Sequence, residues 1–421
     1  TYTVTVTLTD DDGGVGIATT TAEIAGIRIK DGVLQIFGTR SEDRVKLTHY
    51  GSRYYKVYAD FLPDAGHTRL ISADGIKAIE IWMSGGDDRV DIIGRIKVPV
   101  TMMGQDGDDV MVGSCGDETL DGGAGDDVLI GAGGGDHLIG GLGDDLLVGD
   151  YAMLRAAAFR GMDPSDLDIP FQMADLERNL YLPAASDVLE GGEGADMLVG
   201  DHLLVVAGLA QGAGSDDGGC YSKIEIGNIR ADIHLGAGSD SLAGGSGNDV
   251  LIGDSRTVVA AVAGDLNWSP GQPTGRYSYG PRLTVEVEDL VDDLTLCGGS
   301  DTLSGDAGDD VLIGDNRTDV VALAGGILLQ APDQRPDHFH GYYRPRLDIE
   351  VEDLVDDLSI HGGDDVLCGD AGDDELIGDN RTRVAALAGG IEITVPDPQN
   401  PHPHFGSYYR PTVEIQVEDL V

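Results

Sequence analysis

The sequence predicts an all-β solenoid: a parallel β-roll that is interrupted by repeated long β-hairpin inserts. Three observations lead to this prediction. A nine-residue unit repeats without gaps, the same unit returns four more times further along the chain, and a longer repeat of a little over sixty residues contains both the unit and an insert. A fixed short period of this kind is the sequence signature of a solenoid.

The contiguous repeat spans residues 104–148 and consists of the units GQDGDDVMV, GSCGDETLD, GGAGDDVLI, GAGGGDHLI and GGLGDDLLV. Each unit has Gly first and fourth, an acid sixth and an apolar residue eighth. Paired glycines permit positive φ and let the backbone turn its carbonyls inward. The last three residues suit a very short strand with one side chain inward and two outward. Since such a unit makes half a coil, two units complete one coil of the roll.

The sixth-position acids are candidate metal ligands, because stacked acidic loops repel one another unless a cation lies between them. Carboxylate and carbonyl oxygens select calcium over softer metals. The candidate side-chain ligands in this array are Asp109, Glu118, Asp127, Asp136 and Asp145. The candidate backbone ligands belong to Gly104, Gly107, Gly122, Gly125, Gly131, Gly140 and Gly143. The competing interpretation is a solvated acidic turn without an ion.

These units resemble the RTX, or haemolysin-type calcium-binding, nonapeptide repeat, which is written G-G-x-G-x-D-x-U-x. The resemblance implies a right-handed parallel β-roll with calcium bound between successive loops on each edge. It also implies that the sixth-position Asp is the side-chain ligand. Glu118 departs from this pattern, and its longer side chain makes that site the expected exception.

Composition narrows the classes of partner. The chain has 75 acids against 27 bases and a net charge of −48, which argues against nucleic acid and anionic membranes as partners. Such acidity is also typical of disorder, but the regular apolar positions favour a folded chain. The four cysteines show no CxxC spacing. The sequence contains no targeting signal, no apolar run of membrane-spanning length and no common catalytic motif, so we expect a protein that is not an enzyme.

Residues 1–24 predict a hairpin, with Tyr2, Val4, Val6 and Leu8 on one face of its first strand and an Asp/Gly turn before its second. This hairpin resembles the last hairpin of a PKD or cadherin-like β-sandwich domain of secreted surface proteins. The resemblance implies that the other strands of that domain are missing. A free-standing hairpin of this size would be marginally stable.

Three further regions follow. Residues 25–103 are interpreted as a divergent β lead-in to the roll, because Asp43 and Asp88 each precede a valine by two residues as in the repeat. An unrelated small β domain is the alternative. Residues 104–150 form the contiguous roll, and residues 151–421 alternate inserts with short repeat blocks. We expect the sequence to be a fragment cut in mid-repeat, since its final VEDLV continues into another block in both earlier copies.

Each of the four later blocks contains one full nonapeptide, at residues 191, 244, 305 and 369. A shortened unit precedes it and a Gly-Asp pair follows it, so that a block amounts to about one and a half coils. That length places two loops on one edge of the roll and predicts at least one shared cation site. The candidate ligands in these blocks are Asp187, Asp196, Asp240, Asp249, Asp301, Asp310, Asp365 and Asp374.

The inserts are themselves repeats, because VEDLV recurs at 287, 351 and 417. We interpret each insert as a long β-hairpin that leaves the roll and rejoins it, with successive hairpins side by side in a second sheet. The face of Leu283 and Val285 is expected to pack against that of Leu347 and Ile349. Residues 151–182 have helical apolar spacing and predict a short helical excursion.

The insert tips carry polar and aromatic residues. His338 and His340, with His402 and His404, could bind a transition metal, and the alternative is exposed tip residues. The Tyr-Tyr-Arg-Pro tips could contact a carbohydrate or a cell-surface protein, and the alternative is packing between hairpins.

Together these features predict a calcium-binding repeat region of a secreted or cell-surface bacterial protein. Its expected role is a calcium-stabilised structural spacer or adhesin scaffold. The alternative is the export and folding module of an RTX enzyme, such as a protease, a lipase or a polysaccharide-modifying enzyme, whose catalytic domain lies elsewhere.

Overall fold

The computed structural model describes residues 2–9, 15–22, 25–63, 66–159, 172–173, 180–215, 221–227, 233–269, 282–288, 291–325, 327–330, 346–351, 355–388, 391–394 and 412–417. Every regular element in these ranges is a β-strand, which confirms the predicted all-β class. Within the described ranges, no helix has the length and apolar character that crossing a membrane requires.

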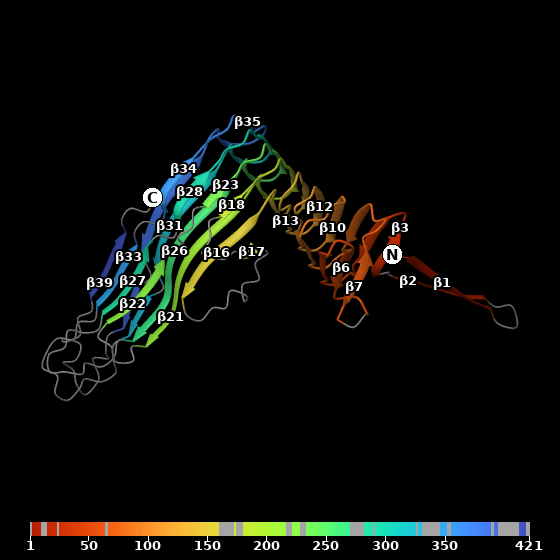
Figure 1. Ribbon diagram of the computed structural model, residues 1–421, viewed down its shortest axis with the longest axis horizontal. Helices are drawn as coiled ribbons and strands as arrows, with labels where there is room; N and C mark the ends of the chain where they lie inside the picture. Colours follow the sequence, from red (N-terminus) through yellow and green to blue (C-terminus); the bar gives the residue numbers. More distant parts are fainter. Residues whose placement is uncertain are drawn as a thin grey trace.

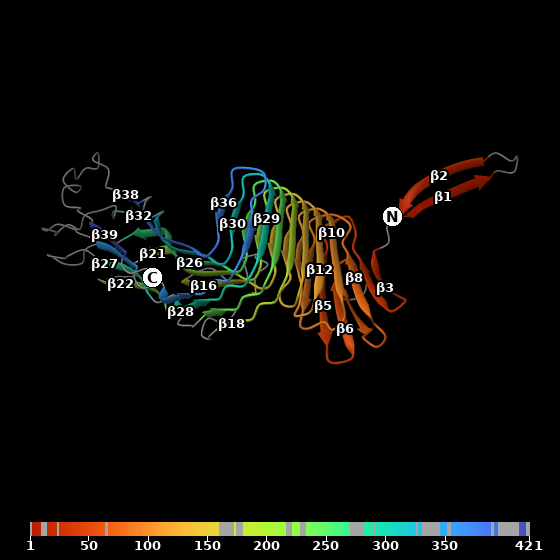
Figure 2. The same ribbon diagram turned by 90° about the horizontal axis from the view of Figure 1, so that it is seen from above.

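Two parallel sheets form the roll, and the chain passes from one to the other in every coil. The first sheet contains β10 (Val100–Asp106), β12 (Glu118–Ala124), β14 (His137–Leu142), β19 (Val188–Glu193), β24 (Ser241–Ser246), β29 (Thr302–Ala307) and β35 (Val366–Cys368). The second contains β11 (Val110–Val112), β13 (Val128–Ile130), β15 (Leu146–Val148), β20 (Met197–Val199), β25 (Val250–Ile252), β30 (Val311–Ile313) and β36 (Glu375–Ile377). Equivalent residues pair in register, as Leu120 does with Leu138. The predicted parallel β-roll is therefore confirmed, and Figure 2 shows its coils stacked along the long axis.

Eighth-position side chains fill the interior of the roll. Leu120, Leu129, Leu138 and Leu147 are fully buried, and they belong to one continuous cluster that extends from the lead-in to Leu312. Burial of each such side chain stabilises the fold by roughly 1.5–3 kcal/mol. Each half-coil thus contributes one apolar side chain, from its eighth position, to the core.

The ninth-position side chains of the second sheet point outward, as the sequence predicts, but they are buried on that outer face. Val148 and Ile252 are 0 % exposed and lie in a second apolar cluster with Leu203, the first residue of β21 (Leu203–Ser215). Nη1 of Arg256, at the start of the next insert, lies 2.8 Å from Sδ of Met197. Residues at the start of the inserts therefore cover the outer face of the second sheet, which explains why its ninth positions are apolar.

The strands of residues 25–103 continue both sheets of the roll. In the first sheet, β4 (Val33–Phe37) and β8 (Ala78–Trp82) run parallel to β10. In the second, β5 (Arg44–Tyr50) and β9 (Arg89–Ile93) run parallel to β11. Antiparallel strands occupy the end of each sheet: β3 (Gly26–Lys30), β6 (Tyr54–Ala59) and β7 (Thr68–Ser72). This pairing favours a lead-in that caps the solenoid over a separate β domain.

The inserts form three further sheets beside the roll (Figure 1). The outgoing arms form a parallel sheet of β17 (Gln172–Met173), β16 (Ala152–Phe159), β21, β26 (Arg256–Ser269), β31 (Arg317–Gly325) and β37 (Arg381–Ala388), which β32 (Ile327–Gln330) and β38 (Ile391–Thr394) extend. The returning arms form one sheet of β22 (Tyr221–Gly227), β27 (Arg282–Glu288), β33 (Arg346–Val351) and β39 (Thr412–Val417). Nearer the roll they form another, of β18 (Leu180–Leu182), β23 (Ile233–Leu235), β28 (Val291–Leu296) and β34 (Val355–Ile360).

The predicted hairpin pairing is wrong, because the described strands of an insert pair in parallel with the equivalent strands of neighbouring inserts. Where two described strands of one insert pair with each other, as β16 and β17 do, they are parallel and form no hairpin. Each coil of the roll advances by one strand spacing, about 4.8 Å, which leaves room for one strand per sheet and not for a hairpin two strands wide. Leu283 and Val285 accordingly lie in register beside Leu347 and Ile349 in one sheet. Burial of these four side chains lies outside the described part of the structure.

The helical prediction for residues 151–182 is wrong where the structure describes the chain. Ala152–Phe159 forms strand β16, which pairs along its full length with β21. Its sequence AMLRAAAF favours a helix locally, but the neighbouring insert offers a complete row of backbone partners. Tertiary pairing therefore overrides helix propensity. Most of the second expected helical segment lies outside the described residues.

An antiparallel hairpin of β1 (Tyr2–Thr9) and β2 (Val15–Ala22) precedes the roll. It forms a two-stranded sheet of its own and projects from the lead-in end of the molecule (Figure 2). The structure does not describe the side chains of most residues in this hairpin, so the predicted common face of Tyr2, Val4, Val6 and Leu8 stays a prediction. The hairpin itself agrees with the strand–turn–strand pattern of the sequence.

Candidate calcium sites

Acidic residues form a continuous ladder along each edge of the roll. In the first ladder, the backbone N–H of each acid donates a hydrogen bond to Oδ1 of the equivalent acid in the next coil, with N to O distances of 2.7–3.1 Å. Its members are Asp43, Asp88, Asp109, Asp127, Asp145, Asp196, Asp249, Asp310 and Asp374. The second ladder, on the opposite edge, has distances of 2.6–3.0 Å and consists of Glu118, Asp136, Asp187, Asp240, Asp301 and Asp365.

The other carboxylate oxygen of most ladder acids is buried and accepts no hydrogen bond. Asp127 is 1 % exposed and Asp240 is 3 % exposed, and their Oδ2 atoms have no partner in the described structure. The same is true of Oδ2 in Asp88, Asp109, Asp136, Asp145, Asp187, Asp196, Asp249, Asp301, Asp310 and Asp365. Because an unpaired buried charge is very costly, rows of such oxygens are suited to bind cations.

Each of these oxygens faces a first-position glycine. A Cβ atom on Gly104 would overlap Oδ2 of Asp109 and would lie 2.6 Å from the carbonyl oxygen of Gly122 in the next loop. The space that a side chain would fill is therefore bordered by a carboxylate oxygen and a carbonyl oxygen. Gly122, Gly131 and Gly140 repeat this arrangement. Calcium prefers oxygen donors of this kind, so the residues fit the ion.

The fourth-position glycines are required for a different reason. Gly107, Gly125 and Gly143 have φ values of 127°, 137° and 127°, which residues with a side chain rarely adopt. A Cβ atom on Gly125 would also collide with the carbonyl oxygen of Gly107 in the preceding loop. These glycines therefore let successive loops stack closely enough to share oxygen atoms.

Burial raises the pKa of the ladder carboxyls. The pKa of Asp127 rises to about 8, first because the side chain is buried and then because Asp109, Asp145 and Asp108 are like charges. Burial likewise raises the pKa of Asp136 to about 9. A hydrogen bond from the neighbouring coil lowers each value only in part. Protons and calcium therefore compete for the same oxygens near neutral pH.

The structure brings the sequence-predicted ligands together in these two ladders, although their coordination of calcium stays a prediction. Of the thirteen predicted acids, Glu118 and Asp374 are the two that have no carboxylate oxygen both buried and unpartnered among the described atoms. Both carboxylate oxygens of Glu118 bind Ser114 in their own loop: Oε2 accepts from the backbone N–H at 3.0 Å and Oε1 from Oγ at 2.8 Å. The longer side chain of Glu118 thus changes the site, as its departure from the pattern predicts.

Sequence reasoning missed two ladder members as ligands, Asp43 and Asp88, whose loops lack the full glycine pattern. Oδ2 of Asp88 is buried without a partner, as in the contiguous repeat, and burial raises its pKa to about 8. The signal that could have identified both acids is their position two residues before a valine. The first ladder therefore begins within the lead-in.

Four loops on the second-ladder edge are divided by the inserts, and we call them split loops. Their first two residues, Gly-Asp, precede an insert, and their remaining residues follow it. A Cβ atom on Gly149 would overlap Oδ2 of Asp187, 38 positions later in the chain. The same relation joins Gly200 to Asp240, Gly253 to Asp301, and Gly314 to Asp365. The shortened unit and the preceding Gly-Asp pair are therefore two parts of one complete loop, which corrects their interpretation as separate loops.

The comparison with protein-family models identifies these loops. The model described as the RTX calcium-binding nonapeptide repeat (four copies) matches residues 112–147, 184–201, 232–255, 298–326 and 361–380. The chain contains RTX calcium-binding repeats. RTX nonapeptide repeats bind calcium, so calcium is the ion that these loops hold. Searches of curated proteins and of solved structures gave no match.

The matched RTX segments include three split loops on both sides of their inserts, the second part of the first split loop, and the contiguous array from residue 112 onward. In the described ranges, no group of three or more His, Cys, Asp or Glu side chains gathers as a metal cluster. The RTX loops do not require one, because each contributes one sixth-position carboxylate and backbone carbonyls. Bound calcium supplies the positive charge that offsets the repulsion between stacked carboxylates, while the protein keeps its donors in register through the β-ladders.

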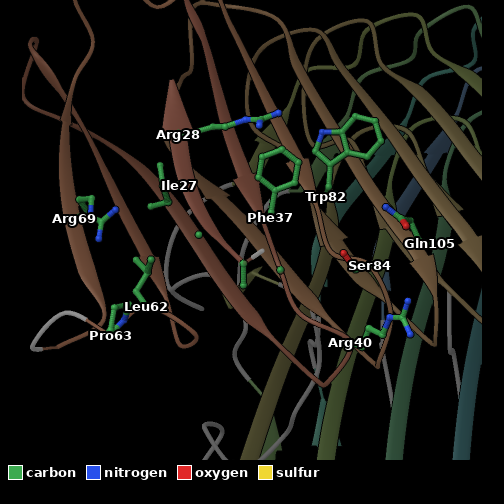
Figure 3. Close-up of a pocket in the computed structure, with 13 residues that line it drawn as sticks. Ile27, Arg28, Phe37, Arg40, Leu62, Pro63, Arg69, Trp82, Ser84 and Gln105 are labelled. Carbon is green, nitrogen blue, oxygen red and sulfur yellow. The ribbon is translucent and has the colours of Figure 1, made fainter. Parts of the chain in front are cut away.

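A separate cavity of about 790 Å³ lies at the lead-in, lined by residues that include Arg28, Phe37, Arg40, Arg69 and Trp82 (Figure 3). The Arg28 guanidinium lies 4.8 Å from the centroid of the Phe37 ring. Positive and aromatic side chains do not make a cation site, so this cavity is chemically distinct from the two ladders. The histidine and Tyr-Tyr-Arg-Pro tips of the inserts lie outside the described residues.

Proposed function

We propose that this chain is a calcium-stabilised structural spacer or adhesin scaffold in a secreted or cell-surface bacterial protein. The observation that carries the proposal is the row of buried, unpartnered carboxylate oxygens that continues along both edges of the roll. Their repetition from coil to coil suits one repeated structural role and gives no single pair of acids the distinct surroundings of a catalytic site.

Calcium concentration then acts as the folding signal. Extracellular calcium modules bind with dissociation constants of about 10⁻⁴ to 10⁻³ M, so such sites are filled outside a cell and empty in the cytosol. An ion that binds only the folded state stabilises that state by mass action. RTX repeat proteins are typically secreted by bacteria, which agrees with this use of the calcium gradient.

The insert sheets support the scaffold role. The second, third and fourth inserts each add a strand to all three sheets beside the roll, and the sheet of outgoing arms continues from β16 to β37. The roll and the inserts thus lengthen together as coils are added. Together with the N-terminal hairpin, which we propose as the end of a PKD or cadherin-like domain, this extended form suits a spacer between other domains. The insert tips are the proposed contacts for carbohydrate or for a surface protein.

Stretching single molecules in magnetic tweezers tests the spacer role. In millimolar calcium, the chain should hold its length until it yields in steps, whereas in excess chelator it should extend smoothly like an unfolded chain. The same smooth extension in both solutions would contradict the proposal.

The alternative is that the chain serves as the export and folding module of an RTX enzyme, and the matched RTX repeats favour this candidate equally. The two roles separate when the chain is fused behind a folded reporter in a bacterium that secretes RTX proteins. An export module raises secretion of the reporter above that of the reporter alone. A spacer leaves secretion unchanged.

A further inference from the structure

The second residue of each split loop is an aspartate that spans the base of an insert. We call Asp150, Asp201, Asp254 and Asp315 the junction aspartates. The carboxylate of Asp254 accepts a hydrogen bond from the backbone N–H of Gly299 at 2.7 Å, although 45 positions separate the two residues. In the other split loops, the corresponding distances are 3.0 Å to Ala185, 2.9 Å to Gly238 and 2.6 Å to Gly363. One side chain thus joins the two ends of each of the four inserts whose two ends the structure describes.

The backbone of the junction aspartates differs from that of the first-ladder loops. There the second residue turns through left-handed conformation, with φ of 85° at Gln105 and 65° at Asp306. None of the four junction aspartates, all of which the structure describes, has a positive φ. Because the chain leaves for the insert at this point, the loop loses the local turn that presents carbonyl oxygens. The carboxylate of the junction aspartate stands at that position.

Two junction aspartates carry an oxygen that no hydrogen bond explains. Asp254 is 0 % exposed and Asp150 is 1 % exposed, yet Oδ2 of Asp254 and Oδ1 of Asp150 have no partner among the described atoms. The strongest charge acting on Asp254 is that of Asp301, and the strongest on Asp150 is that of Asp187. Asp301 and Asp187 each have an unpartnered Oδ2 as well. Each of these split loops therefore holds two adjacent buried carboxylates, each with a free oxygen.

Calcium suits this geometry better than a smaller cation. Magnesium demands near-ideal octahedral geometry and gives up water reluctantly, whereas calcium accepts irregular sets of six to eight oxygens and binds carboxylates in several modes. A split loop offers carboxylate and carbonyl oxygens from two chain segments that an insert separates. Two carboxylates and nearby carbonyls provide the charge and the oxygen donors for one calcium ion.

We propose that Asp150 and Asp254 are calcium ligands, so that the ion in each of their split loops binds residues on both sides of an insert. The proposal rests on the calcium binding of the RTX loops and adds a ligand that the nonapeptide pattern does not contain. It gives calcium a second role, because the ion that stabilises the roll also closes the base of the insert and orders its arms. Loss of calcium at a split loop therefore releases the insert strands locally.

The test is an Asp254→Asn variant of the full chain, compared with Asp306→Asn. Asn at 254 keeps an oxygen for the Gly299 N–H but loses the charge. Asp306 is the matched control, because it is also a second-position aspartate but is exposed and lies in an unsplit loop. Hydrogen exchange at rising calcium concentrations gives, for each strand, the calcium midpoint at which its amides become protected. Magnesium replaces calcium in a parallel series.

We expect the calcium midpoint of β26 and β28 to rise roughly tenfold in D254N, as for loss of a charged ligand, while β11 and β13 change less than twofold. D306N should leave all four strands within twofold of wild type, and magnesium should not substitute. Equal midpoints in D254N and wild type, or equal shifts in D254N and D306N, would overturn the proposal. If protection of the wild-type strands did not depend on calcium, the proposed function as a calcium-stabilised scaffold would be contradicted instead.

A chelator series separates a ligand from a purely structural clamp. Without calcium, Asn at 254 relieves repulsion with Asp301, so protection of β26 should equal or exceed that of wild type. A clamp without an ion predicts the same loss of protection in chelator and in calcium, and that result would contradict the proposal. If D254N fails to fold at any calcium concentration, Asp150→Asn repeats the test at the other split loop with an unpartnered oxygen, with β16 and β18 as the strands measured.

Discussion

The loops on the two edges of the roll close in different ways. On the first-ladder edge, the loop closes through its own backbone, with left-handed residues such as Gln105 and Asp306 at the second position. In the split loops of the second-ladder edge, a junction aspartate closes the loop through its side chain. It accepts a hydrogen bond from a backbone N–H that lies 35, 37, 45 or 48 positions later in the chain. A carboxylate can accept the same N–H whatever lies between the two chain ends. The comparison shows how a solenoid accepts inserts of different lengths without losing its period.

The largest effect should come from pH in the absence of calcium, because many carboxyls of both edges act together. Burial raises the pKa of Asp127 to about 8 and that of Asp240 to about 9, from 3.8. Between pH 4 and 9 the folded, calcium-free roll therefore holds more protons than the unfolded chain, so its stability falls as pH rises. Urea unfolding in chelator should give a higher midpoint at pH 5 than at pH 8. A midpoint that rises with pH would contradict the account.

A first-position glycine should be the next most sensitive feature. In Gly122→Ala the new Cβ would overlap Oδ2 of Asp127 and lie 2.8 Å from the carbonyl oxygen of Gly140, and the backbone cannot easily yield. We expect the free energy of unfolding in millimolar calcium to fall by about 3 kcal/mol. Gly200→Ala should lower the free energy of unfolding similarly on the second-ladder edge, since its Cβ would meet Asp240 and Gly253.

Gly378→Ala is the matched control, because it is also a first-position glycine but has nothing within 4 Å of its would-be Cβ. Its effect should stay within about 0.5 kcal/mol. Urea unfolding of the three variants checks these values. Equal losses in G122A and G378A would show that the glycines serve only backbone flexibility.

Replacing a sixth-position acid should lower stability in calcium and raise it in chelator. In Asp127→Asn, calcium loses a ligand, and stability in millimolar calcium should fall by about 1.4 kcal/mol, the contribution RT ln(1 + [Ca]/Kd) of one site at roughly ten times its dissociation constant. In chelator at pH 8, the same change removes a buried like charge beside Asp109 and Asp145 and should stabilise the roll. Asp240→Asn should do the same on the second-ladder edge. Thermal unfolding in both solutions measures the sign, and a loss in both would argue against calcium as the partner of these acids.

The smallest effect should follow from Glu118→Gln. Both oxygens of Glu118 already bind Ser114, so this side chain contributes little to an ion. The calcium stoichiometry measured by equilibrium dialysis should equal that of wild type, whereas Asp136→Asn, in the next loop of the same ladder, should lower it. Equal reductions in the two variants would show that Glu118 is a full ligand.

The sequence predicts the roll well because its determinants are local. A first-position glycine, a sixth-position acid and an eighth-position leucine recur every nine residues, and each has a fixed physical role. Gly122 leaves room for oxygens, Asp127 supplies one, and Leu129 fills the core. Pattern alone therefore places both ladders from residue 104 onward.

The inserts could not be predicted in the same way, because their pairing depends on the spacing of the roll. AMLRAAAF forms β16 since β21 lies beside it one coil away, and no local signal contains that fact. The split loops were hidden for a similar reason: Gly200 and Asp240 complete one loop although an insert separates them. The sequence contains one clue to the split loops: each Gly-Asp pair supplies the two residues that the next shortened unit lacks.

Circular dichroism of the full chain at pH 8 shows whether calcium stabilises the roll, because at that pH the carboxyls of Asp109 and Asp301, whose pKa values burial raises to about 7, are largely charged without an ion. We expect a strong β signal and a high thermal midpoint in millimolar calcium, a weaker signal and a lower midpoint in excess chelator, and full return of both when calcium is restored. The same β signal and the same thermal midpoint in calcium and in chelator would contradict this expectation.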